Sequence, residues 1–81
     1  MDAITLHILS PEGTVLSAPV SLVTLPGVAG SFTVLPGHAP LITALEKGDV
    51  RYIREGREER LPIREGFVEV RDNQVVVCVE V

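Results

Sequence analysis

The chain has 81 residues, enough for one small domain, and 46% of them are hydrophobic, which can supply a core. Its net charge of −4 argues against nucleic-acid binding, for which a basic stripe is expected. The single cysteine, Cys78, excludes an intrachain disulfide, and no apolar run approaches the ~18 residues of a membrane span. Because Cys78 lies in a run of valines, we interpret it as a small buried apolar side chain rather than a nucleophile.

The charged residues are distributed unevenly along the chain. Residues 1–45 contain only Asp2 and Glu12 and no lysine or arginine, whereas residues 46–65 carry two-thirds of all charges. A stretch as long as residues 1–45 cannot be wholly buried in so small a domain. Depletion of charge marks the core of an interface, so we predict an interaction surface within this first half.

The beginning of the chain predicts three short strands joined by turns. Residues 4–8 alternate between apolar and polar side chains, which is typical of a half-buried strand. Proline and glycine within residues 10–14 predict a turn, residues 15–17 a short return strand, and residues 20–25 a third strand. His7 alternates outward and is expected to be exposed.

The segment Pro26-Gly27-Val28-Ala29-Gly30 predicts a loop with an apolar tip. Turn tips usually carry polar residues, so Val28 and Ala29 would be out of place on the surface of a monomer. Two interpretations remain open: the loop folds back and buries Val28, or it docks against a partner.

A strand that runs into a rigid corner is predicted next. Residues 31–35 alternate, and Pro36-Gly37 ends the strand, because glycine accepts the positive φ at the third position of a type II turn. Pro40 restricts the residue before it to extended geometry. His38 is thereby held on a constrained loop, where it either makes a structural hydrogen bond to loop backbone or contacts a partner; catalysis is the least favoured role, because the sequence shows no oriented partner.

Residues 41–47 are compatible with a strand or with a short helix ending before Gly48. An isolated helix of seven residues is marginal, and the neighbouring segments alternate as strands do. We therefore predict a strand for residues 41–47.

The second half of the chain predicts two hairpins. One is charged and turns at Glu55-Gly56; the other turns at Asp72-Asn73, a pair suited to positive φ. Residues 74–81 are apolar on both faces, which indicates a central strand. Together the elements predict a single all-β domain over residues 1–81, a small β-sandwich or flattened barrel of about eight to ten short, mostly antiparallel strands.

Motifs that carry catalysis or bind cofactors are absent from the sequence. There is no phosphate-binding loop, no dinucleotide fingerprint, no zinc motif and no nucleophile elbow. Glu46, Asp49 and Glu55 alternate with basic residues and are interpreted as a solvated, salt-bridged face. We therefore predict no catalytic residue, no metal ligand and no cofactor.

The run Ser31-Phe32-Thr33-Val34-Leu35-Pro36-Gly37-His38-Ala39-Pro40-Leu41 resembles the signature of the epsilon subunit family of F-type ATP synthases. The similarity extends from about Leu6 to Val79 and includes Gly48-Asp49-Val50 and residues 65–70. It also supports a strand at 41–47. The resemblance implies a non-catalytic central-stalk subunit of a proton-translocating ATP synthase, peripheral on the cytoplasmic face of the bacterial inner membrane, that links the gamma subunit to the c-ring.

The resemblance also implies two sets of contact residues by position. The c-ring would be contacted by Gly27, Val28, Ala29, Gly30 and Ser31. The gamma subunit would be contacted by Ser10, His38, Ala39 and Leu41. Both sets fall in the charge-poor half of the chain, which the composition had already indicated as an interaction surface.

Two departures from the family pattern change the expectations. Members often carry acidic residues in the glycine-flanked loop, but Val28 and Ala29 are apolar, so a ring contact here would be apolar and hydrogen-bonded rather than ionic. Many members continue into a C-terminal helical hairpin that inhibits ATP hydrolysis and can bind ATP, whereas this sequence stops at Val81; we expect neither property. A free-standing β-sandwich module that docks through Val28-Ala29 is the alternative function.

Overall fold

Nine β-strands and no helix make up residues 3–81, the part of the chain that the computed structural model describes. The strands are β1 (Ile4–Ser10), β2 (Gly13–Val20), β3 (Leu22–Gly27), β4 (Gly30–Val34), β5 (Leu41–Leu45), β6 (Gly48–Arg54), β7 (Arg57–Ile63), β8 (Glu65–Arg71) and β9 (Gln74–Glu80). The all-β prediction and the expected strand number are confirmed, and β5 confirms a strand rather than a helix after Pro40. Residues 1 and 2, counted in the predicted domain, lie outside the described residues.

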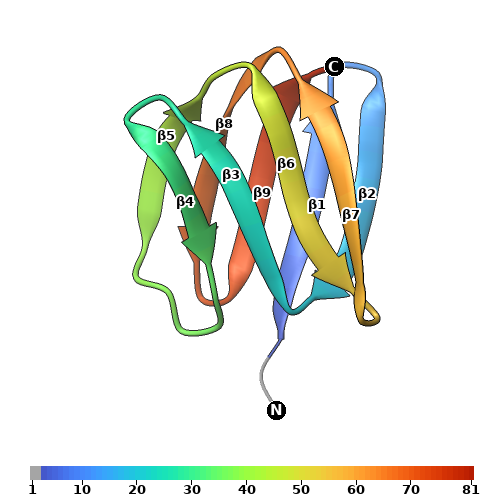
Figure 1. The fold of residues 1–81 in the computed structure, drawn as a ribbon, viewed down its shortest axis with the longest axis vertical. Helices are drawn as coiled ribbons and strands as arrows, with labels where there is room; N and C mark the ends of the chain where they lie inside the picture. The colour runs from blue at the N-terminus through green and yellow to red at the C-terminus, as the bar shows by residue number, and fades with distance from the viewer. Residues whose placement is uncertain (1–2) are drawn as a thin grey trace.

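The strands form one sheet that folds over on itself into two layers. Its order is β2-β1-β9-β8-β5-β3-β6-β7, with β4 paired to the free side of β3. Figure 1 shows β4, β3, β6 and β7 crossing in front of β8, β9 and β1. The layers are joined at one side by a single pair, Gly27 of β3 with Leu45 of β5, and β2 contacts β6 at the other side. The result is the flattened, nearly closed sandwich that the sequence predicts.

All neighbouring strands are antiparallel except β1 and β9, which pair in parallel. Parallel neighbours require a long crossover connection rather than a hairpin. Here β1 and β9 are the first and last strands, so the whole intervening chain is that connection. The pairing places β9 between β1 and β8, which confirms the prediction of a central strand.

The core consists of apolar side chains from alternate positions of both layers. None of the described polar or charged side chains is buried. Burial of apolar surface, about 25 cal/mol per Å², is therefore the main term that holds the layers together. The fully buried large side chains are Ile4, Leu6, Ile8, Val23, Leu25, Val34, Val50, Val68, Val70, Val75 and Val77.

Two of the hairpin turns depend on residues with positive φ. Glu55 and Gly56 have φ of 53° and 76° between β6 and β7, and Asp72 and Asn73 have φ of 51° and 60° between β8 and β9. A type I′ turn requires positive φ at both central residues, and its twist matches that of the strands it joins. The turn predicted at Asp72-Asn73 is thus confirmed.

His7 is not simply exposed, as its outward position in a single strand suggested. Its ring is half-buried, with Nδ1 at 2.9 Å from Ser17 Oγ and Nε2 at 3.1 Å from Gln74 Oε1. The imidazole therefore bridges β2, β1 and β9 across the outer face of the sheet. The two partners come from strands whose pairing with β1 the alternation of one strand cannot reveal.

Gly66 in β8 is a position where the fold leaves no room for a side chain. A Cβ atom at Gly66 would lie 2.2 Å from the carbonyl oxygen of Cys78 and 3.0 Å from Cα of Val79. We predict that Gly66→Ala destabilises the domain by about 2 kcal/mol or more, because the backbone of β9 has to move. For a domain of this size the melting temperature should fall by about 10 °C.

The matched control for this prediction is Glu65→Ala, at the exposed neighbouring position of the same strand. Surface substitutions of this kind usually change stability by no more than about 0.5 kcal/mol. Thermal unfolding followed by circular dichroism distinguishes the two variants. Equal melting temperatures for Gly66→Ala and the original chain would contradict the close packing of β8 on β9.

Tyr52, the only tyrosine in the chain, links stability to alkaline pH. Burial, together with the charge of Glu59 and a hydrogen bond to its carboxylate, raises the pKa of the phenol above its ordinary value of 10.0, against the opposing charge of Arg54. The folded state thus favours the neutral phenol, and this contribution is fully present below pH 10. It is lost as the pH rises from 10 through the folded-state pKa, because the unfolded chain ionises first.

We predict that Tyr52→Phe makes the free energy of unfolding fall less steeply above pH 10. Urea unfolding at a series of pH values measures this slope, and tyrosinate absorbance of the original chain gives the folded-state pKa directly. A phenol that titrates at its ordinary value in the folded chain would contradict the expected linkage.

Candidate functional site

The apolar loop forms the tight turn between β3 and β4. Gly27 and Gly30 are paired at its base, and Val28 and Ala29 form its tip. The backbone N–H of Val28 donates to the carbonyl oxygen of Ala44 in β5, at 3.1 Å. The side chain of Val28 nevertheless remains 55% exposed. The interpretation that the loop folds back and buries Val28 is therefore wrong: the backbone is tethered, but the apolar side chain points outward.

The two glycines of this loop are required for different reasons. A Cβ atom at Gly27 would lie 2.7 Å from the carbonyl oxygen of Gly30 and 3.0 Å from the ring of Phe32. Gly30 has open space around its Cα but a φ of 136°, which side-chain-bearing residues rarely adopt. The tip is thus held in one shape by backbone constraints at both of its ends.

The corner after β4 has the geometry that the sequence predicts. The N–H of His38 donates to the carbonyl oxygen of Leu35 at 3.1 Å, and Gly37 has a φ of 84°, as a type II turn requires. The ring of His38 is half-buried, and its Nδ1 donates to the carbonyl oxygen of Ala39 at 2.7 Å. The predicted structural hydrogen bond to loop backbone is confirmed. With the proton on Nδ1, Nε2 is left as an acceptor.

A groove between β4 and β5 brings together residues from both predicted contact sets. Its volume is about 390 Å³. From the c-ring set it contains part of the Gly27–Ser31 loop, and from the gamma set it contains His38 and Leu41. The lining residues are Gly27, Ala29, Gly30, Ser31, Phe32, His38, Leu41 and Thr43.

Ser10, which also belongs to the predicted gamma contacts, does not line this groove. It lines a larger groove of about 770 Å³ together with Val28, at the end of the domain that carries the β1–β2 and β3–β4 turns. Figure 1 shows these two turns at one end of the molecule and the loop from β4 to β5 at the other. Ser10 and His38 therefore belong to opposite ends, and the gamma set is not one compact patch.

The outer face of the rear layer carries exposed apolar residues that the sequence analysis did not assign to a site. Cross-strand pairing places Ala44, Phe67, Cys78 and Leu9 in one row across β5, β8, β9 and β1. Phe67 is 52% exposed, and Ile42 on the same face is 71% exposed. Cys78 is half-buried in this row rather than in the core, which corrects its predicted burial.

Phe67 could have been identified from the sequence. Val68 and Val70 are buried, so Phe67 lies out of phase with the core positions of β8. An aromatic residue in phase with the polar positions of an amphipathic strand is expected on the surface, and it indicates a contact surface where other exposed apolar residues adjoin it. Ile42 gives the same signal in β5, where the buried position is Leu45.

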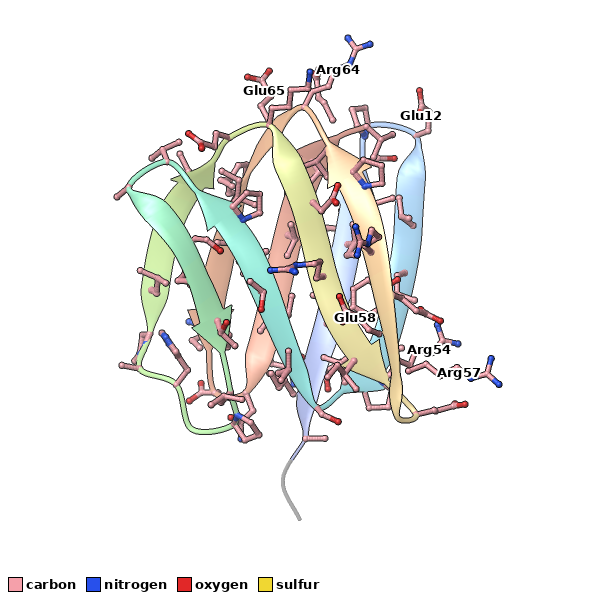
Figure 2. The ribbon with its side chains drawn as sticks, viewed as in Figure 1. Glu12, Arg54, Arg57, Glu58, Arg64 and Glu65 are labelled. Carbon is pink, nitrogen blue, oxygen red and sulfur yellow. The ribbon has the colours of Figure 1, made fainter. Side chains whose placement is uncertain are left out.

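Charged residues cluster on the β6–β7 hairpin, but Glu65, Glu69 and Glu80 lie on the same outer face as Phe67. Figure 2 shows Arg54, Arg57 and Glu58 along the β6–β7 hairpin, and Glu12, Arg64 and Glu65 at the end of the domain near the C-terminus. Arg60 lies 3.5 Å from Asp49 and 4.0 Å from Glu58, with all three side chains substantially exposed. Such pairs contribute little to stability, ~0–1 kcal/mol each. The hairpin is therefore the solvated face that the sequence predicts.

Neither a metal-binding cluster nor a membrane-spanning helix is found among the described residues. Residues 3–81 contain no group of three histidine, cysteine, aspartate or glutamate side chains that could hold a metal ion. No helix in that range is long and apolar enough to cross a membrane. The fold and the surface together define a class of protein: a small all-β sandwich that presents a constrained apolar loop and an apolar sheet face to its surroundings.

The family follows from comparison with known proteins. The family described as ATP synthase, Delta/Epsilon chain, beta-sandwich domain matches residues 3–81. The ATP synthase epsilon chains of Desulfitobacterium hafniense and Carboxydothermus hydrogenoformans are 45% and 46% identical over 76 residues. That alignment covers 94% of this chain but only 58% and 57% of those relatives. The chain belongs to the ATP synthase delta/epsilon family and spans a little over half the length of these relatives.

Solved structures agree with this assignment. A chain in the mitochondrial ATP synthase of Euglena gracilis, solved with its c-ring, matches with a TM-score of 0.89 and 26% identity, over 95% of this chain and 50% of that chain. A chain in the central stalk and c-ring structure of the Tetrahymena thermophila mitochondrial enzyme shares the fold, with a TM-score of 0.81 and 15% identity, over 99% of this chain and 65% of that chain.

The constraint at Gly27 gives a prediction for the loop. We expect Gly27→Ala to destabilise the domain by about 1–3 kcal/mol, because its Cβ would meet the Gly30 carbonyl and the Phe32 ring. Ala29→Ser, an exposed change in the same loop, is the control and should leave stability within about 0.5 kcal/mol. Urea unfolding measures both, and a neutral Gly27→Ala would show that the tip is adaptable.

Proposed function

We propose that this chain is a non-catalytic central-stalk subunit of a proton-translocating F-type ATP synthase, which links the gamma subunit to the membrane c-ring and so couples ion flow to ATP synthesis. The observation that carries the proposal is the exposed apolar tip at Val28, adjoining a groove with His38 and Leu41 in the charge-poor half of a chain of this family. The protein would lie at the cytoplasmic face of a bacterial inner membrane, where the other subunits of the enzyme would hold it.

The c-ring contact in this proposal is the loop Gly27–Ser31. Its tip carries no charge, so the contact would consist of apolar packing by Val28 and hydrogen bonds to loop backbone. The two glycine constraints and the tether to Ala44 fix the loop before a partner arrives. A preformed loop loses little conformational entropy on binding, which favours a firm contact from a small area.

The gamma contact in this proposal is an extended surface. Because Ser10 and the His38 loop lie at opposite ends, we propose that a partner that contacts both crosses the outer face of β5, β8 and β9. Ile42 and Phe67 are exposed on that face. A gamma subunit lying across this face would bury both side chains and still reach Ser10, His38, Ala39 and Leu41.

Residues 3–81 have a mechanical role in this proposal. A rotating coupler has to transmit torque without shearing, and two layers closed around an almost entirely apolar core resist relative sliding. We propose no catalytic residue, no cofactor and no ATP binding for this domain, and hairpin-mediated inhibition of ATP hydrolysis is not among its proposed properties.

Binding to an isolated gamma subunit tests the proposal. We predict that His38→Ala combined with Ala39→Asp weakens gamma binding about tenfold or more, since a central contact residue contributes more than about 1 kcal/mol. Leu41 is left unchanged because it packs against the core, and its loss would confuse folding with binding. Isothermal titration calorimetry gives the dissociation constants, with unfolding curves to confirm equal stability.

Two matched variants separate the surfaces. Val28→Asp, in the proposed ring loop, should leave gamma binding unchanged but reduce proton-driven ATP synthesis in the assembled enzyme. Arg57→Glu, on the solvated β6–β7 hairpin, should leave both unchanged. A chain that binds no gamma subunit but forms a defined complex with another protein through Val28 would overturn the proposal in favour of a free-standing binding module.

A further inference from the structure

The loop that carries His38 is held to the rest of the domain by very little. Its six residues, Leu35–Pro40, are exposed except for His38, which is half-buried. Two of its hydrogen bonds are internal: His38 N–H to Leu35, and His38 Nδ1 to Ala39. The prolines stiffen the loop but do not set its direction relative to the sheet.

One hydrogen bond connects this loop to another element within residues 3–81. The N–H of Gly37 donates to the side-chain oxygen Oδ1 of Asn73, at 2.7 Å. Asn73 lies 36 positions further along the chain, in the turn between β8 and β9. The backbone carbonyl of the same residue accepts from the N–H of Thr5, at 2.9 Å, where β1 enters its pairing with β9. A single half-buried residue thus joins three segments that are distant in sequence.

The two bonds of Asn73 come from different parts of the residue. The oxygen that accepts the hydrogen bond from the Thr5 N–H is the backbone carbonyl oxygen of Asn73. The φ of this residue, 60°, is set by the turn. The oxygen that accepts the hydrogen bond from the Gly37 N–H is Oδ1 of the Asn73 side chain. Glycine would also satisfy the turn, since it adopts positive φ without strain. The amide side chain is therefore not needed for the hairpin, and its contact with Gly37 is its distinguishing feature.

We propose that Asn73 is a positioning residue, which fixes the His38 loop against the end of the rear sheet layer and so presents His38 and Ala39 in one orientation. Without this acceptor the proline-braced loop moves as a stiff unit about its two ends. The consequence for partner binding rests on the function proposed above; the positioning of the loop does not. Asn73 itself need not touch the partner.

Two substitutions isolate the acceptor. Asn73→Gly keeps positive φ and the backbone carbonyl but removes the side-chain oxygen. Asn73→Asp keeps an oxygen at the same place and should restore the bond. Amide hydrogen exchange by NMR reads the bond directly: in Asn73→Gly, protection of the Gly37 N–H should fall about five- to tenfold, the loss expected for one hydrogen bond. Protection of the Thr5 N–H should stay unchanged, and Asn73→Asp should restore protection at Gly37.

NMR backbone relaxation provides a second measurement, of local motion in the loop, and a change in the global stability of the domain would not by itself alter it. Order parameters at Gly37, His38 and Ala39 should fall from values typical of a rigid backbone, about 0.85, toward about 0.6 in Asn73→Gly. Unchanged protection and order at Gly37 would overturn the proposal. Equal loss of protection at Gly37 and Thr5 would also overturn it, because the turn as a whole would then be responsible.

Gamma binding completes the test. Asn73→Gly should weaken gamma binding severalfold, and Asn73→Asp should restore it. If the original chain binds no gamma subunit, the proposed function fails while the exchange data still decide the positioning role. If gamma binds Asn73→Gly as tightly as the original chain although Gly37 has lost its protection, loop orientation does not matter for binding and that part of the proposal is wrong.

Discussion

The structure depends on one constraint: the space between the two sheet layers is filled by apolar side chains, and the one hydroxyl group among them belongs to Tyr52. No polar or charged side chain among the described residues is buried there. The strict alternation of nine short strands produces this interior, because a strand shifted by one residue would turn its whole apolar set outward. Apart from the Tyr52 phenol, the polar side-chain groups of the described residues are consequently at or near the surface. The function of such a domain has to be sought in loops and sheet faces rather than in an internal cavity.

The sequence predicted the features that are decided locally. The alternation gave the strands, and the positive-φ residues gave the turns at Gly37 and Asp72-Asn73. Features decided by contacts between distant segments could not be predicted. These include the parallel pairing of β1 with β9, the two partners of His7, and the bond from Gly37 to Asn73. No local signal specifies which strand will lie beside another in a sheet of this order.

The candidate site shows the same division. The apolar tip at Val28 and the constrained loop at His38 were both evident from glycine and proline spacing. Their arrangement in space could not be predicted. In the fold, His38 and part of the Gly27–Ser31 loop line one groove, whereas Ser10 lies at the end of the domain opposite to His38. The exposed aromatic Phe67 was not assigned to a contact surface, although it lies out of phase with the buried positions Val68 and Val70. The surface was thus predictable in composition but not in shape.

In the proposed role, a rigid coupler has to resist motion at two levels, and the structure opposes each kind of motion in a different way. Shear between the layers is opposed by a core of almost entirely apolar side chains, where any displacement exposes apolar area to water. Motion of the contact loops cannot be opposed in this way, because exposed loops bury little. Their stiffness comes instead from backbone restrictions, such as the paired glycines below Val28, and from single hydrogen bonds to neighbouring strands. We expect loops held by so few bonds to be sensitive to changes in residues that no partner touches, as proposed for Asn73 in the turn between β8 and β9.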